Sequence, residues 1–191
     1  MTEKEKMQAG EWYDATDADL DAERRHAKVL CHELNQTSPA NEARREELLG
    51  ELLGELGADS EVLGPFLVDY GSLVRIGEAT FINHGAYLMD GGGITIGSHV
   101  QIGPNCGMYT AQHPIDAAER RTGAERALPI VVEDDVWIGG DVTILSGVTI
   151  GASSIVGAGS VVTKDVPAGS IAVGNPCRVI REVREDDRVG L

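Results

Sequence analysis

The sequence has no long apolar run and only three cysteines, and each shortage excludes a class of protein. No apolar stretch approaches the roughly 18 residues that a membrane-spanning helix needs, so we expect no such helix. The cysteines are odd in number and form no Cys-X-X-Cys pair, which argues against a disulfide framework and favours a reducing compartment. The first ten residues are charged and unlike a secretion signal, so we expect a cytoplasmic protein.

Positive charge is also scarce. The chain has 31 acidic residues against 16 basic ones, a formal charge of −15, and only four of the basic residues are lysine. Because a surface of this sign repels nucleic acid and anionic membranes, we exclude both as partners. An acidic, lysine-poor surface suits a protein that works at high salt, and a GC-rich genome would deplete lysine in the same way.

The chain does contain a repeat of six residues. From Val132 to Pro167 it reads VEDDVW, IGGDVT, ILSGVT, IGASSI, VGAGSV, VTKDVP, and the same phase holds from Ile96 to His113. A branched or long apolar residue opens each of the six units that begin at Val132. An α-helix would need apolar residues about every 3.6 positions and a half-buried strand every second position, so neither explains the pattern. A period of six is typical of the hexapeptide parallel β-helix.

Each unit makes one short strand and one corner, so three units close a triangular coil of about 18 residues. The first residue of each unit is expected to point into the prism. Glycine and aspartate at other positions suit corners, where glycine adopts a positive φ without strain. These residues are Gly139, Gly140, Asp141, Gly151, Gly157 and Gly159. The block 76–93 has the same pattern two residues out of phase, which predicts a small corner insertion around Gly91 to Thr95.

Residues 114–129 interrupt the repeat. This stretch, PIDAAERRTGAERALP, is polar and has no period of six. Because a loop of this length inside a compact domain is usually functional, we predict a loop that protrudes from one corner of the prism. The predicted fold is therefore mainly β, a parallel β-helix with one protruding loop and a helical segment before it.

Two helices are predicted before the repeat, over residues 16–35 and 38–56. The first begins with a Thr-X-X-Asp that resembles a capping box, and the second begins at Ser38 and Pro39. Five leucines of the second helix form an apolar stripe, which we expect to dock on the β-helix or on a neighbouring subunit. The chain is thus expected to have three parts, a helical segment (1–57), a β-helix domain (58–180) and a tail (181–191).

Several motifs resemble the maltose and galactoside O-acetyltransferase family. They are TAQHPID at 110–116, the block VWIGGDVTILSGVTIGASSIVGAGSVVTKDVP, the ending GNPCRVIRE and the N-terminal EKEKMQAGEWYDATD. The resemblance covers nearly the whole chain. It implies a left-handed β-helix that transfers acetyl from acetyl-CoA to a maltose- or glucose-like sugar hydroxyl, with no metal required. It also implies a homotrimer whose active sites lie between neighbouring prisms.

Acetyl transfer to a hydroxyl needs a base, donors for the thioester oxyanion and a groove for the CoA arm. His113 closes a hexad just before the loop, where a side chain can face a cleft, and it matches the family position. We therefore predict that His113 is the general base. His26 and His32 lie in the helical segment, and His99 has no obvious partner.

The resemblance also implies an acceptor site. Asn83 matches an asparagine that contacts the acceptor and supports the transition state. Asp69 and Asp90 match positions that face the acceptor sugar, and Glu125 in the loop is a further candidate. Each of these could instead be an ordinary corner or loop residue. Asp69 favours a maltose-like acceptor, whereas the two residues after Asn83 depart from the family pattern and leave the acceptor open.

The donor side is predicted from charge. Lys164 is the only lysine after residue 28, and Arg178, Arg181 and Arg184 follow it in an otherwise acidic chain. Because CoA carries phosphates, such cations would bind it through charge-assisted hydrogen bonds. The family match implies a groove for pantetheine and nucleotide, with Trp137 near it, along Gly140, Ala158, Thr163, Lys164 and Arg178.

Three other interpretations stay open. A γ-type carbonic anhydrase shares the prism but binds zinc through three converging histidines, and here only His84, His99 and His113 could serve. A related acyltransferase could act on serine, an antibiotic or a nucleotide-linked amino sugar. A β-helix without catalysis would explain neither the loop nor the histidine before it.

Overall fold

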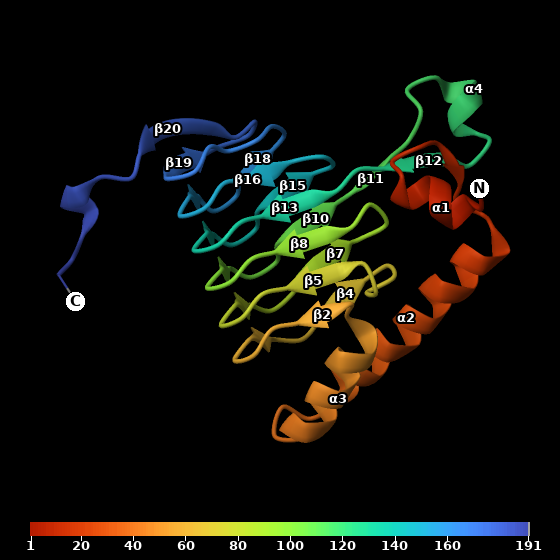
Figure 1. The fold of residues 1–191 in the computed structure, drawn as a ribbon, viewed down its shortest axis with the longest axis horizontal. Helices are drawn as coiled ribbons and strands as arrows, with labels where there is room; N and C mark the ends of the chain where they lie inside the picture. The colour runs from red at the N-terminus through yellow and green to blue at the C-terminus, as the bar shows by residue number, and fades with distance from the viewer. Residues whose placement is uncertain (191) are drawn as a thin grey trace.

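The chain folds into a triangular prism of coiled strands with helices at its N-terminal end (Figure 1). The structure, a computed structural model, describes residues 1–190. Its helices are α1 (Glu3–Gln8), α2 (Ala18–Gln36), α3 (Glu42–Leu52) and α4 (Ala117–Arg120), with a 3-10 turn at Glu185–Asp187. None of the helices in residues 1–190 combines the length and the hydrophobicity that a membrane span needs.

Three sheets form the faces of the prism. The first face contains β2 (Glu55–Leu56), β5 (Val74–Ile76), β8 (Ile94–Ile96), β13 (Ile130–Val132) and β16 (Thr149–Ile150). The second contains β3 (Glu61–Val62), β6 (Phe81–Ile82), β9 (Gln101–Ile102), β14 (Trp137–Ile138), β17 (Ile155–Val156), β19 (Ser170–Val173) and β20 (Arg178–Glu182). The third contains β4 (Leu67–Val68), β7 (Tyr87–Met89), β10 (Gly107–Tyr109), β15 (Thr143–Leu145) and β18 (Val161–Val162). The parallel β-helix predicted from the period of six is therefore confirmed.

The coils are not all of one length. On the first face, Ile76 pairs with Ile96, 20 positions later, whereas Val132 pairs with Ile150, 18 positions later. All four side chains are buried in the central column. The two extra residues of the longer coil lie in the turn between β7 and β8, so the predicted insertion around Gly91 is confirmed.

The corners of the prism are named by the faces that they join. The first corner joins the first and second faces. The second corner, between the second and third faces, contains residues 83–86, 103–106, 139–142 and 157–160. The third corner, between the third and first faces, contains residues 69–73, 90–93, 146–148 and 163–165, and in one coil it is replaced by residues 110–129.

The corner glycines differ from the prediction in their physical reason. Of the six residues predicted to suit positive φ, only Asp141 and Gly159 have it. A Cβ on Gly139 would instead lie 2.6 Å from the backbone nitrogen of Ala158 in the next coil, and Gly151 is equally tight against the coil that follows it. Glycine is needed at these two positions because neighbouring coils approach closely, not because of backbone strain.

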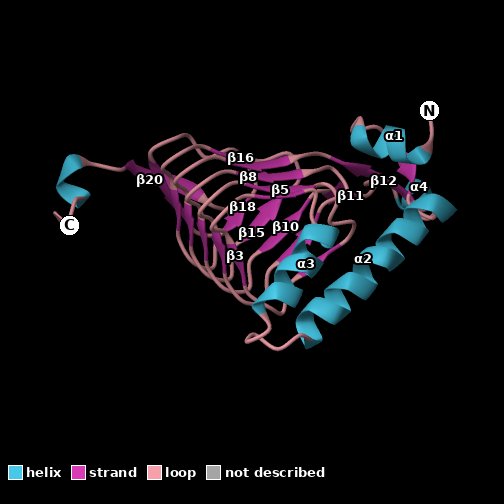
Figure 2. Cartoon of the chain, turned by 60° about the horizontal axis from the view of Figure 1, so that its bottom comes forward, coloured by secondary structure: helices cyan, strands magenta, loops and turns pink. Residues whose placement is uncertain are grey.

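The leucine stripe of α3 docks on the prism, as predicted. Leu48, Leu49 and Leu52 belong to the same buried cluster as Val62 of the first coil. Figures 1 and 2 show α3 beside the first coils and α2 leading from there toward the loop that contains α4.

The predicted boundaries need small corrections. The side chain of Asp17, not of Thr16, caps α2, and α3 begins at Glu42 because the residues after Ser38 form a turn. Strand β2 already pairs within the prism before residue 57. Strand β20 includes Arg181 of the predicted tail.

Arg45 of α3 links the outer edge of the first coil to α2. Its Nη2 donates to the carbonyl of Val62 (3.0 Å) and its Nη1 to the carbonyl of Leu34 (3.3 Å). We expect Arg45→Met, which keeps an apolar stem, to lower the free energy of unfolding by about 2 kcal/mol, because two carbonyls lose a charged donor. Denaturant titration measures this loss. Arg44→Met is the matched control, since its partners are exposed glutamates, and it should cost much less than Arg45→Met. If both variants lost the same free energy of unfolding, Arg45 would not be the link between the first coil and α2.

Candidate active site

The predicted loop leaves the third corner and folds into an ordered sheet. Strands β11 (Ala111–Gln112) and β12 (Ala124–Ala127) pair antiparallel, and β1 (Tyr13–Asp14) adds to the other edge of β12. The loop is thus confirmed, but the N-terminal segment holds it. Strand β1 was not predicted from the sequence, because a strand of two residues has no periodic signal.

A cavity of about 460 Å³ lies between this sheet, α2 and the third corner. Three of the predicted site residues, Asp69, His113 and Glu125, line it. The N-terminal segment contributes Tyr13 and Arg24, which sequence analysis did not single out. The structure therefore brings the imidazole and one carboxylate of the loop together with a second carboxylate, Asp69, from the corner of an earlier coil.

His113 follows β11, and its side chain is 55% exposed. Its Nε2 lies 3.8 Å from Oε1 of Glu125. The other carboxylate oxygen of Glu125, Oε2, accepts a hydrogen bond from the hydroxyl of Tyr13 (2.9 Å). Burial and the charge of Glu125 raise the pKa of Tyr13 well above its ordinary value, so this hydroxyl keeps its proton and remains a donor.

Asp90 is fully buried beneath this cavity. Its Oδ1 accepts from the backbone nitrogens of Asp69 (3.1 Å) and Tyr70 (2.8 Å), which belong to the cavity wall. Desolvation raises the pKa of Asp90 to about 6. The prediction that Asp90 faces the acceptor does not fit this burial, because the side chain supports the wall from behind. Asp69, by contrast, lines the cavity and accepts from the hydroxyl of Tyr87 (2.5 Å).

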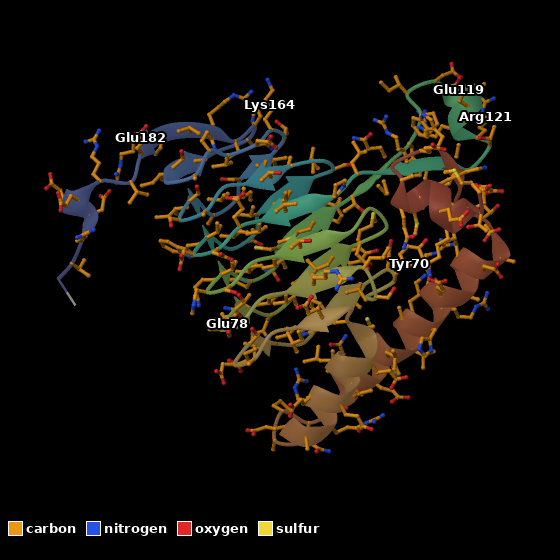
Figure 3. The ribbon with its side chains drawn as sticks, in the orientation of Figure 1. Tyr70, Glu78, Glu119, Arg121, Lys164 and Glu182 are labelled. Atoms are coloured by element: carbon orange, nitrogen blue, oxygen red, sulfur yellow. The ribbon has the colours of Figure 1, made fainter. Side chains whose placement is uncertain are left out.

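Arg24 joins α2 to the cavity wall. Its Nη1 donates to the hydroxyl of Tyr70 (2.7 Å) and its Nη2 to the carbonyl of Ala15 (2.7 Å). Figure 3 shows Tyr70 between the prism and the N-terminal helices. The N-terminal segment therefore closes one side of the cavity.

Asn83 lies at the second corner, across the third face from His113. Its Oδ1 accepts from the backbone nitrogen of His84 (2.8 Å). Gly140 and Ala158 lie at this same corner in later coils, and the Gly159 nitrogen donates to the Gly140 carbonyl. One chain alone therefore does not bring Asn83 and His113 together.

The predicted CoA-binding residues divide between the two edges of the third face. Trp137 is exposed on β14, the strand that leads directly into the second corner. Arg178 is the first residue of β20. Thr163 and Lys164 lie at the third corner, the edge that carries the loop, and Figure 3 shows Lys164 at the last coils of the prism.

Arg181 differs from the other predicted cations because its guanidinium is already paired. Its Nη1 and Nη2 donate to the carboxylate of Asp187 (2.6 and 2.9 Å). These hydrogen bonds lower the pKa of Asp187 to about 2. Arg181 would therefore have to exchange this partner before it bound a phosphate.

The three histidines of the zinc interpretation lie apart. His99 is at the first corner, His84 at the second and His113 after β11 at the third. Among residues 1–190, no three His, Cys, Asp or Glu side chains gather in a group that could hold a metal ion.

The class of hexapeptide-repeat transferases follows from two family matches, one to the coils and one to the N-terminal helices. Residues 129–164 match the family described as bacterial transferase hexapeptide (six repeats), and residues 6–57 match the maltose acetyltransferase hexapeptide capping motif. The chain belongs to the maltose/galactoside acetyltransferase family, and its β-helix is of the left-handed type.

Relatives match over nearly the full chain. A putative acetyltransferase of Staphylococcus haemolyticus is 52% identical over 98% of both chains. The solved structure of a maltose O-acetyltransferase from Clostridium difficile is 45% identical, with a TM-score of 0.95 over 97% of this chain and 99% of that one. A hexapeptide-repeat acetyltransferase from Vibrio cholerae, solved in complex with acetyl coenzyme A, is 46% identical, with a TM-score of 0.90 over 97% and 100%.

Proposed function

We propose that the protein transfers the acetyl group of acetyl-CoA to a hydroxyl of a maltose- or glucose-like sugar, with His113 as general base. The observation that carries this proposal is the cavity that His113 shares with Asp69 and Glu125. Carboxylates accept hydrogen bonds from sugar hydroxyls, and an imidazole can take a hydroxyl proton near neutral pH. The maltose O-acetyltransferase and the acetyl-CoA complex among the relatives support the same assignment.

The reaction needs one proton to move twice. The imidazole of His113 takes the proton of the acceptor hydroxyl while that oxygen bonds to the thioester carbonyl carbon. The carbon–sulfur bond then breaks, the acetyl group stays on the acceptor oxygen, and the CoA sulfur leaves with the proton from the imidazolium. The side-chain amide of Asn83 would donate to the oxyanion that forms between these steps.

The active site is proposed to form between subunits of a homotrimer. Asn83 and His113 lie at opposite edges of the third face, so the second corner of one prism must meet the third corner of another. The third face suits contact between subunits because it exposes two leucines, Leu67 and Leu145. The same face carries Tyr87 and Tyr109, which pack edge to face with their ring centroids 6.0 Å apart. A head-to-tail contact of this kind closes when the rotation is threefold.

The CoA groove is proposed to follow the same junction. Trp137, Gly140, Ala158 and Arg178 would come from one subunit, and Thr163 and Lys164 from the next, with Arg181 joining if it leaves Asp187. Gly140 and Ala158 have small side chains, which lets the pantetheine arm approach backbone amides. The cations would bind the phosphates.

We expect Lys164→Ala and Arg178→Ala each to raise the KM for acetyl-CoA about tenfold, because each removes a charge-assisted contact to a remote part of the donor. The KM for the acceptor and kcat should change little. Steady-state kinetics at fixed ionic strength measures this. Arg75→Ala, on the first face and paired with Glu55, is the control. If both variants kept the donor KM of the parent, these residues would not bind CoA.

The proposed function is tested by thiol release from acetyl-CoA on addition of maltose or glucose, compared with serine and an amino sugar. We expect the sugars to be the better acceptors. Preference for serine or an amino sugar would assign the chain to an acyltransferase with another acceptor.

A further inference from the structure

Glu125 occupies an unusual position in the candidate site. It lies on the central strand of the three-stranded sheet, directly opposite Tyr13 of β1. Tyr13 is buried in a small core with Met7 and Ala127, so its hydroxyl is held firmly. The hydrogen bond from Tyr13 to Oε2 therefore fixes the carboxylate of Glu125 and turns Oε1 toward Nε2 of His113, 3.8 Å away.

We propose that Glu125 is a positioning residue for His113, anchored by Tyr13, rather than mainly a ligand of the acceptor. This inference rests on the proposed function, in which His113 becomes an imidazolium when it takes the acceptor proton. The carboxylate of Glu125 stabilises that positive charge and holds the ring in one orientation. The arrangement makes β1, and with it the N-terminal segment, part of the catalytic machinery.

No second carboxylate in the cavity occupies a comparable position. Asp69 is engaged by the hydroxyl of Tyr87 at the prism wall. The loop cation in the cavity, Arg120, donates through Nη1 to the carbonyls of Pro114 and Ile115, so it orders the backbone that follows His113. Among the described side chains that line the cavity, only Glu125 forms an ionic contact with His113.

The test is a double-mutant cycle between Glu125→Gln and His113→Ala. Glutamine can still accept from Tyr13 but carries no charge. We expect Glu125→Gln to lower kcat roughly 10- to 100-fold, a part of the 10²–10⁴-fold that a general base contributes, with little change in acceptor KM. In the His113→Ala background the same substitution should have no further effect, because Glu125 acts through the imidazole. The proposal would be overturned if Glu125→Gln lowered kcat as much in the His113→Ala background as in the parent. It would also be overturned if Glu125→Gln raised the acceptor KM and left kcat unchanged.

Two further variants sharpen the cycle. Tyr13→Phe should lower kcat about three- to tenfold alone and add little to Glu125→Gln, because it acts through the same carboxylate. Glu119→Gln is the matched control. It removes the same charge from the same loop, but Glu119 lies on α4 and does not line the cavity (labelled in Figure 3). Its kcat should equal that of the parent.

A measurement without substrate separates this inference from the proposed function. In protein labelled with ¹⁵N-histidine, we expect the His113 resonances to shift in Glu125→Gln and to stay in place in Glu119→Gln. Unchanged resonances in both variants would overturn the contact between Glu125 and His113. A His113→Ala variant that kept full activity would instead overturn the proposed base, whatever the spectra showed.

Discussion

Replacing His113 with alanine is expected to lower kcat by about 10²–10⁴-fold, the usual contribution of a general base. The fold should survive, because the side chain is 55% exposed and lies outside both buried clusters. Thiol release from acetyl-CoA measures the rate, and a thermal melt of the same sample measures the fold.

The control for this experiment is His32→Ala, which removes an exposed histidine of α2 that does not line the cavity. It should keep the parent rate. If His113→Ala kept activity within about fivefold of the parent, the loss would be far smaller than a general base accounts for and His113 would have no place in the mechanism.

Mixing two inactive variants is expected to restore activity. His113→Ala and Asn83→Ala each remove one member of a site that we propose to lie between two subunits. In trimers reassembled from equal amounts of both, about a quarter of the junctions would pair an intact His113 with an intact Asn83. Activity should therefore rise from near zero to about a quarter of the parent value.

The reassembled sample needs two checks. Light scattering should show the mass of a trimer for each variant and for the mixture. Mixing the folded trimers without dissociation should restore nothing, because no junction is exchanged. If co-assembled trimers stayed inactive while both variants kept the trimer mass, the two residues would belong to one subunit's site or to none.

The sequence predicted most of the fold because the period of six is a direct consequence of the coil. Each apolar position that opens a hexad, such as Ile138 or Ile150, is buried in the prism. The shift in phase before Ile96 also corresponds to a real corner insertion. The prediction that corner glycines are needed for a positive φ was wrong at Gly139. A side chain is excluded there by contact with the next coil, which the sequence does not show.

The candidate site was predictable only in part. His113, Asp69 and Glu125 could be named from the sequence, and the structure places all three around one cavity. Their relation to Tyr13 could not be predicted, since a two-residue strand more than 100 positions away supplies the hydrogen bond. Asp90 is the opposite case, because a carboxylate predicted to face the acceptor sugar is buried and accepts a hydrogen bond from the backbone.

The most direct test of the account is the identity of the product. Purified protein is incubated with acetyl-CoA and maltose or glucose, and the released thiol is compared with the acetylated sugar found by mass spectrometry. We expect one acetylated sugar for each thiol released, and a loss of both in His113→Ala. Thiol release without an acetylated sugar, or no turnover with any sugar while another acceptor is acetylated, would contradict it.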